Sequence, residues 1–145
     1  MSKDDFLQSY NDAMWREKRI GEKVIQLRER QRSAGAVKYS DMPPGTDLHD
    51  LSDYIVQLET RISELIDAKN RTDAVLEVMC DVFKRLPRQD ERDVLYYKYV
   101  RGWKAQKIAD KLSYARRTVY RIEEAAIEHL DITEYDAKKI EKLLA

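Results

Sequence analysis

The sequence predicts an all-α protein, on the strength of its composition and its patterning. Only four glycines and three prolines occur among 145 residues, whereas 37% of the residues are charged. This balance favours long solvated helices over strands joined by tight turns. Apolar residues also recur at three- and four-residue steps along much of the chain, which is the period of one helix face.

A first helix is expected from about residue 5 to residue 32. Its apolar stripe is interrupted by Glu17 and consists of Phe6, Tyr10, Ala13, Ile20, Val24 and Leu27. Residues 33–47 lose this period and include Pro43, Pro44 and Gly45, none of which suits the middle of a helix. We therefore expect residues 33–47 to form a loop.

A second helix is expected over residues 48–85, and it carries the most regular pattern in the chain. Steps of four and three alternate along a heptad seam made of Leu51, Ile55, Leu58, Ile62, Leu65, Lys69, Thr72, Leu76, Met79, Phe83 and Leu86. Such a seam is buried either against the first helix, in an antiparallel hairpin, or against another chain, in a homodimer. The pattern leaves both arrangements open. The polar Lys69 and Thr72 have two possible interpretations: they form a buried polar contact that fixes the register of the helices, or they mark a local gap in the packing.

The pattern changes after Pro87, so we expect a helical module over residues 1–86 and a separate domain over residues 87–145. That domain begins with a helix from Gln89 to Val100, which Gly102 terminates. A short helix follows, with one apolar face made of Ala105, Ile108, Ala109 and Leu112. A third helix runs from about Arg116 to Leu130 with Val119, Ile122 and Ala126 turned inward, and an acidic helix ends the chain.

The spacing of this domain indicates a helix-turn-helix. Ala109, Ser113 and Val119 stand at the internal distances of that motif. The formal net charge of the whole chain is zero, yet residues 98–121 hold eight basic residues and one acidic residue, a local charge of +7. A basic segment along such a motif points to double-stranded DNA as the partner.

Residues 86–130, LPRQDERDVLYYKYVRGWKAQKIADKLSYARRTVYRIEEAAIEHL, resemble region 4 of bacterial sigma factors. The similarity is to the variant found in small phage-encoded regulators of late transcription, the RinA and ArpU kind. The resemblance implies a transcriptional regulator that binds promoter DNA, and it leaves host RNA polymerase open as a second partner. Scaffold positions of the family fall on Gly102, Ile108, Ala109, Leu112, Tyr114, Val119, Ile122 and Leu130.

The DNA-facing positions of that family fall on Arg116, Arg117, Tyr120 and Arg121. This chain departs from the family pattern at Lys104 and Ala115, where a capping Ser or Thr is usual, at Ser113, where Gly is frequent, and at Lys107, where Glu is common. Each missing cap weakens its helix by about 1 kcal/mol.

The candidate DNA-binding residues divide into two roles. Arg117 and Arg121 lie opposite Val119 and Ile122 on the third helix, where they would reach base edges in a major groove. Lysines on the preceding helix would contact phosphates without regard to sequence, and Tyr120 would contact a phosphate or a thymine methyl. The full candidate set is Lys104, Lys107, Lys111, Arg116, Arg117, Tyr120 and Arg121, and Lys98 is a further candidate for phosphate contact.

Several other functions lack their sequence signals. The chain has no glycine-rich phosphate loop and no His-Glu-x-x-His motif, so neither an enzyme nor a cofactor is predicted. A single cysteine, Cys80, allows no internal disulfide or Cys-based metal site, and it is expected to pack among apolar neighbours. No apolar run of about 18 residues and no signal peptide occur, so no membrane association is expected and a cytosolic location is predicted.

Two alternative functions remain open beside transcriptional regulation. A small terminase subunit of a phage also combines a helix-turn-helix with coiled helices, although it usually places the DNA-binding module first. A coiled-coil interaction protein is the other alternative. The aromatic residues Tyr99 and Trp103 are expected to cover the three-helix core rather than to stack on bases.

Overall fold

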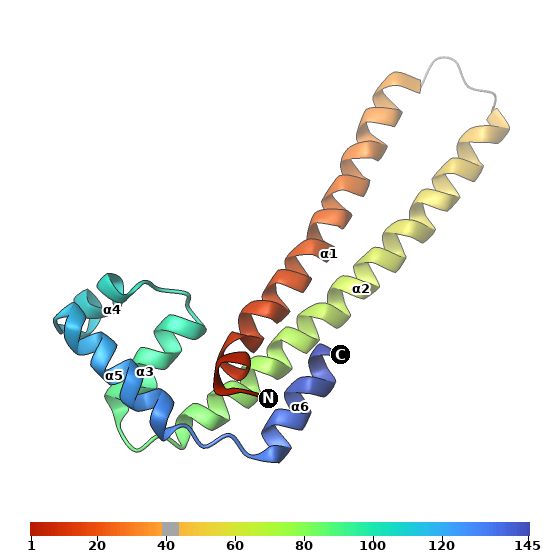
Figure 1. Ribbon diagram of the computed structural model, residues 1–145. Coiled ribbons are helices and arrows are strands. Elements are labelled where there is room, and N and C mark those ends of the chain that lie inside the picture. Colours follow the sequence, from red (N-terminus) through yellow and green to blue (C-terminus); the bar gives the residue numbers. More distant parts are fainter. Residues whose placement is uncertain (39–43) are drawn as a thin grey trace. The chain divides into compact units, whose positions relative to one another are not determined.

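A computed structural model describes residues 1–38 and 44–145, with side chains for residues 1–33 and 50–145, and all regular structure in that part of the chain is helical. The helices are α1 (Lys3–Lys38), α2 (Pro44–Lys84), α3 (Gln89–Tyr99), α4 (Ala105–Leu112), α5 (Arg116–His129) and α6 (Glu134–Leu144) (Figure 1). The predicted all-α class is confirmed. No helix in this part of the chain is long and apolar enough to cross a membrane.

The first two helices extend further than the sequence pattern predicted. Helix α1 continues to Lys38 and helix α2 begins at Pro44, so the expected loop over residues 33–47 is wrong at both of its ends. Residues 39–43 lie outside the described part. Gly35 weakens a helix by about 1 kcal/mol without ending it, and proline is well tolerated at the first position of a helix.

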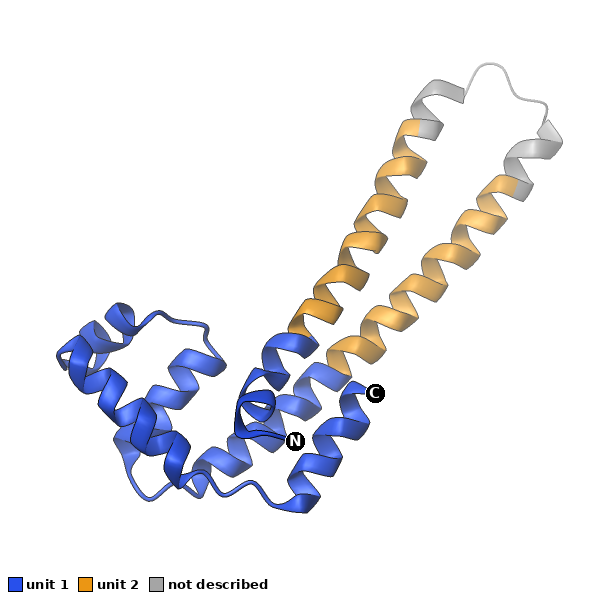
Figure 2. Ribbon diagram, in the orientation of Figure 1, with its two compact units in different colours: residues 1–13, 71–145 blue, residues 14–70 orange. Residues whose placement is uncertain are grey.

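The chain divides into two compact units that cut across the expected boundary at Leu86 (Figure 2). Unit 1 comprises residues 1–13 and 71–145, and unit 2 comprises residues 14–70. The beginning of α1 and the end of α2 thus belong with the carboxy-terminal helices. Their shared apolar cluster is the reason, and its buried members include Phe6, Leu7, Val75, Met79, Phe83, Leu95, Ala126, Leu130 and Ile140.

A second, smaller cluster in unit 1 holds α3, α4 and α5 together. It is built from Val94, Ile108, Ala109 and Val119, with Leu112 and Ile122 packed around them. These are the inward positions that the sequence pattern predicted for the three short helices. Helices α3 and α5 contribute to both clusters, because Leu95 and Ala126 face the larger one while Val94 and Val119 face the smaller one.

Unit 2 consists of antiparallel stretches of α1 and α2 that lie side by side (Figure 2). Gly21 on α1 faces Leu65 on α2, and a Cβ placed on the glycine would stand 3.8 Å from Leu65 Cδ1. The predicted stripe of the first helix is confirmed in both units: Phe6, Ala13 and Val24 are buried, and the other members are half-buried.

The predicted heptad seam is only partly correct. Lys69 is exposed and Ala68 takes its place in the buried row, whereas Thr72 is buried and its hydroxyl donates to the carbonyl of Ala13 at 3.4 Å. At the other end of the seam, Leu51 and Ile55 are each 44% exposed. An α-helix drifts by about 20° per heptad against an exact seven-residue repeat, so one face cannot hold the whole seam.

Candidate nucleic-acid interface

The turn between α4 and α5 depends on one residue in the left-handed conformation. Ser113 ends α4 with φ 60° and ψ 42°, and the backbone amide of Tyr114 donates to the carbonyl of Ala109 at 2.9 Å. Helix α5 begins directly after Ala115, whose backbone is extended. Neither Lys104 nor Ala115 provides a side-chain cap, as the departures from the family pattern indicated.

Two contacts within unit 1 fix the carboxy-terminal end of α5. The ammonium of Lys3 donates to the carbonyls of Ile127 and Glu128 at 2.8 and 3.1 Å, where a cation complements the negative end of the helix dipole. His129 Nδ1 lies 2.9 Å from Oε1 of the buried Glu91, near the beginning of α3. Nothing in the sequence pattern indicated either contact.

The exposed face of α5 is basic over its first half. Val119 is buried in the three-helix core, whereas Arg116, Arg117 and Arg121 are exposed. Tyr120 is 53% exposed beside them. None of the three arginines forms an ion pair within the described residues. Beyond Arg121, the exposed residues on this face are Glu124 and Glu128, so the positive charge is confined to the beginning of the helix.

Helix α4 adds a second row of exposed bases. Lys104, Lys107 and Lys111 are exposed and likewise form no ion pair in the described part of the chain. The ammonium of Lys107 lies 4.4 Å from the centroid of the Trp103 ring, and that ring stacks on Tyr97 with centroids 4.5 Å apart. This cation–π contact positions the Lys107 side chain without neutralising its charge.

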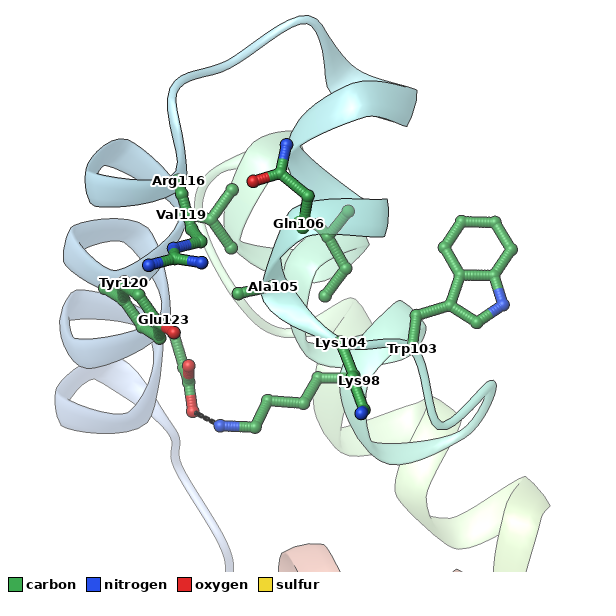
Figure 3. A pocket seen from close by; sticks show the side chains of 10 residues that line it. Lys98, Trp103, Lys104, Ala105, Gln106, Arg116, Val119, Tyr120 and Glu123 are labelled. Carbon is green, nitrogen blue, oxygen red and sulfur yellow. Dashed lines mark hydrogen bonds and ion pairs between the residues drawn. The ribbon is translucent and has the colours of Figure 1, made fainter.

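A groove of about 480 Å³ lies between the end of α3, the beginning of α4 and α5. Lys104, Arg116 and Tyr120 stand on its walls, and Val119 lies at its base (Figure 3). Lys98 also lines this groove, but it is paired with Glu123 (Figure 3). Lys98 is therefore not counted among the bases that are available to phosphate, which corrects the sequence-based expectation.

Glu123 organises this end of the candidate interface, and no pattern in the sequence singled it out. Besides pairing with Lys98, it accepts a hydrogen bond from the Tyr99 hydroxyl at 3.1 Å. Burial raises the pKa of Tyr99 well above its usual value, and the Glu123 carboxylate raises it further. Tyr99 packs on the larger cluster, so its expected place over the three-helix core is wrong, whereas Trp103 does cover that core.

Several other bases of unit 1 are engaged with carboxylates. Arg85 pairs with Asp136, Arg88 with Asp90, and Lys138 with Glu134. At the residue before α4, on α4 and at the beginning of α5, the structure brings all seven sequence-predicted site residues onto exposed positions. Six of these residues are cations without an ion pair in the described chain: Lys104, Lys107, Lys111, Arg116, Arg117 and Arg121.

No group of His, Cys, Asp and Glu in the described residues is arranged to hold a metal ion. Cys80 is partly buried, and burial raises the pKa of its thiol. Comparison with family models, with curated proteins and with solved structures finds no match to this chain. The candidate interface therefore stands on its own geometry.

Proposed function

We propose that this protein binds double-stranded DNA in a sequence-dependent manner and regulates transcription. One observation carries the proposal: in the part of the chain that the structure describes, six exposed cations without carboxylate partners lie at the residue before α4, on α4 and on the first half of α5. A shared core holds these two helices together. Phosphates attract such a concentration of positive charge regardless of sequence. A zero net charge on the whole chain does not oppose this, since residues 98–121 hold eight basic residues and only one acidic residue, and most of the acidic residues lie outside this segment.

Helix α5 is the element proposed to enter the major groove. Arg117 and Arg121 are one helical turn apart on its exposed face, and a guanidinium can bind guanine O6 and N7 in a bidentate manner. Lys104, Lys107 and Lys111 of the preceding turn and helix are assigned to phosphates, as is Arg116 at the edge of the groove in Figure 3. Tyr120 is assigned to a phosphate or a thymine methyl.

The regulatory part of the proposal rests on the resemblance of residues 86–130 to sigma factor region 4 and to phage late-transcription regulators. Under that proposal, promoter DNA is the target and host RNA polymerase is a second candidate partner. A small terminase subunit and a pure coiled-coil interaction protein are the competing functions. We treat these two as outcomes of the experiment below.

The experiment begins with selection of bound sequences from a random DNA pool by the full chain. Affinities for the selected site and for scrambled DNA are then measured at one salt concentration for Arg117→Ala, Arg121→Ala and a Lys104→Ala/Lys107→Ala double variant. Each arginine variant is expected to lower the ratio of specific to non-specific affinity by about 10-fold or more. The lysine variant is expected to weaken binding to both DNAs alike.

A matched control is Arg30→Ala, which removes an exposed arginine from unit 2 and is expected to leave both affinities unchanged. If the arginine variants kept the wild-type ratio while the lysine variant lost it, α5 would not be the reading helix. Absence of DNA binding even at low salt would favour the coiled-coil interaction protein. A ring-shaped oligomer in light scattering would favour the terminase-like function.

A further inference from the structure

An aromatic column forms where α3 ends and α4 begins. The ring of Trp103 stacks on Tyr97 with centroids 4.5 Å apart and an angle of 2° between the planes, and Tyr96 meets Tyr97 edge-on at 5.9 Å. The backbone amide of Trp103 donates to the carbonyl of Tyr97 at 2.9 Å, and both side chains pack against the smaller cluster of unit 1. Ring, backbone and core contacts therefore all hold the indole of Trp103 in place.

Two cations lie against this fixed ring. The ammonium of Lys107 is 4.4 Å from the ring centroid, and the guanidinium carbon Cζ of Arg101 is 5.6 Å from it. These two distances add to 10.0 Å, which is the largest separation that the two charged groups can have. A cation–π contact restricts a basic side chain but leaves N–H donors free for an anion.

No carboxylate neutralises this pair of cations in the described part of the chain. Arg101 and Lys107 are both exposed, and neither forms an ion pair with a described residue. Asp110 is the only acidic residue between positions 98 and 121, and it accepts a hydrogen bond from Gln106 at 3.0 Å instead. Two positive charges held so close together repel each other, and an anion that binds both of them relieves this repulsion.

We propose that Arg101 and Lys107 together bind phosphates of the DNA backbone and that Trp103 positions both side chains for this contact. The inference rests on the proposed DNA binding and deepens it. It adds Arg101 to the candidate interface as a phosphate-binding residue and Trp103 as a positioning residue. Neither of these is one of the seven site residues predicted from the sequence.

The place of the pair favours phosphates over base edges. Trp103 and Lys107 belong to the beginning of α4, and the corresponding helix of a helix-turn-helix crosses the DNA backbone, whereas bases are read from the next helix. Lys104, Lys107 and Lys111 follow each other at steps of three and four, so they share one side of α4. Figure 3 shows the indole of Trp103 pointing away from Arg116, which places the pair outside the groove beside α5.

Trp103 contributes to binding by restricting the two side chains in advance. Long basic side chains lose rotamer freedom when they are fixed on a phosphate, and this loss opposes binding. Contact with the indole removes part of that freedom before DNA arrives. Loss of the ring should therefore weaken binding to any DNA sequence, but only while Arg101 and Lys107 are present.

The first test measures the affinity of the full chain for the selected site and for scrambled DNA over a range of salt concentrations. Arg101→Ala is expected to weaken binding to both DNAs about 5- to 10-fold and to make the log–log salt slope shallower by about one unit. The matched control is Arg88→Ala. Arg88 is an exposed arginine of the same unit that is paired with Asp90, so its variant should keep the wild-type affinity and slope.

A double-mutant cycle tests the positioning role of Trp103. Trp103→Leu is expected to weaken DNA binding about 3- to 5-fold in the wild-type background, but by less than about 1.5-fold when Arg101 and Lys107 are both alanine. Trp103→Phe keeps an aromatic face and should bind within about 2-fold of the wild type. Circular dichroism checks that helicity is retained, and Trp103→Met replaces Trp103→Leu in the cycle if the leucine variant loses it.

The outcomes separate this inference from the proposed function. If the wild type bound DNA but Arg101→Ala kept its affinity and slope, the phosphate assignment would be overturned, and an acidic segment of a partner protein would be the anion that fits the pair. If Trp103→Leu weakened binding equally with and without Arg101 and Lys107, the positioning role would be overturned. Absence of DNA binding by the wild type at low salt would overturn both the inference and the proposed function.

Discussion

The contact between Arg85 and Asp136 shows how single residues tie α6 to the rest of unit 1. Arg85 donates from Nη1 to Asp136 Oδ2 at 2.7 Å and from Nη2 to Oδ1 at 3.3 Å. Asp136 also completes a capping box with Thr133 at the beginning of α6. The hydrogen bonds from Arg85, followed by those from Thr133, hold the pKa of Asp136 below its usual value, although burial opposes them.

The first prediction is that Asp136→Asn lowers the free energy of unfolding by about 2 kcal/mol at pH 7. The folded-state pKa of Asp136 is depressed, so its stabilisation is present above the unfolded pKa of about 4 and is lost as the pH falls through the folded value. Urea unfolding of wild type and variant should therefore converge below about pH 4. Glu134→Gln, in an exposed pair, should cost under about 0.5 kcal/mol. A wild-type advantage that persisted unchanged into acid would contradict this role.

At the scale of elements, two turns around α4 require the left-handed conformation and meet this requirement with different residues. Gly102, between α3 and α4, has φ 68°, and Ser113, between α4 and α5, has φ 60°. Glycine adopts this region at no steric cost, whereas another L-residue loses about 1–2 kcal/mol there. The α4–α5 turn therefore stores strain that the α3–α4 turn does not.

The second prediction is that substitutions at Ser113 and Gly102 change the free energy of unfolding in opposite directions. Ser113→Gly should raise the free energy of unfolding by about 0.5 kcal/mol, because the relief of strain exceeds the entropy that glycine adds to the unfolded chain. Gly102→Ala should lower it by about 1 kcal/mol. A Cβ at position 102 would meet no atom within 4 Å, so this cost comes from the backbone alone. Thermal or urea unfolding measures both changes in the free energy of unfolding. If both substitutions stabilised the protein, or both destabilised it, the strain would not lie at Ser113 alone.

At the scale of the whole molecule, net charge and charge distribution lead to opposite expectations about DNA. The formal net charge of zero predicts no long-range attraction, yet six cations that form no ion pair with any described residue gather around α4 and the beginning of α5. Salt dependence distinguishes these expectations because it counts the phosphates that are contacted, whatever the net charge.

The third prediction is a slope of about −4 in a plot of log affinity against log salt concentration, from contacts of Lys104, Lys107, Lys111 and Arg116 with phosphates. A dimer that engages two half-sites should double this slope. Lys111→Ala should make it shallower by about one unit per interface, whereas Lys138→Ala, which removes an exposed lysine that pairs with Glu134, should leave it unchanged. Fluorescence anisotropy titrations from 50 to 200 mM salt measure the slope for the wild type and both variants. A wild-type slope near zero would rule out electrostatic DNA binding.

The local pattern of residues was sufficient to determine the helical class, the bounds of α3 and α5 to within one residue, and the residues of the core that the three short helices share. Val94, Ile108, Ala109 and Val119 are all predicted inward positions, because amphipathic periodicity and the turn at Ser113 act over short stretches of chain. The same periodicity identified the exposed cations of α4 and α5, since residues opposite a buried face lie in solvent.

Only the tertiary structure decided which helices share a core. Ile140 of α6 is packed with Phe6 and Met79, so α6 and the ends of both long helices form one unit that no boundary drawn along the sequence predicted. Lys98 and Glu123 are likewise brought together from separate helices, which withdraws one predicted base from the interface. Such contacts depend on how helices that are distant in the sequence pack together. Periodicity within one helix shows which of its faces is apolar, but it does not show which other helix covers that face.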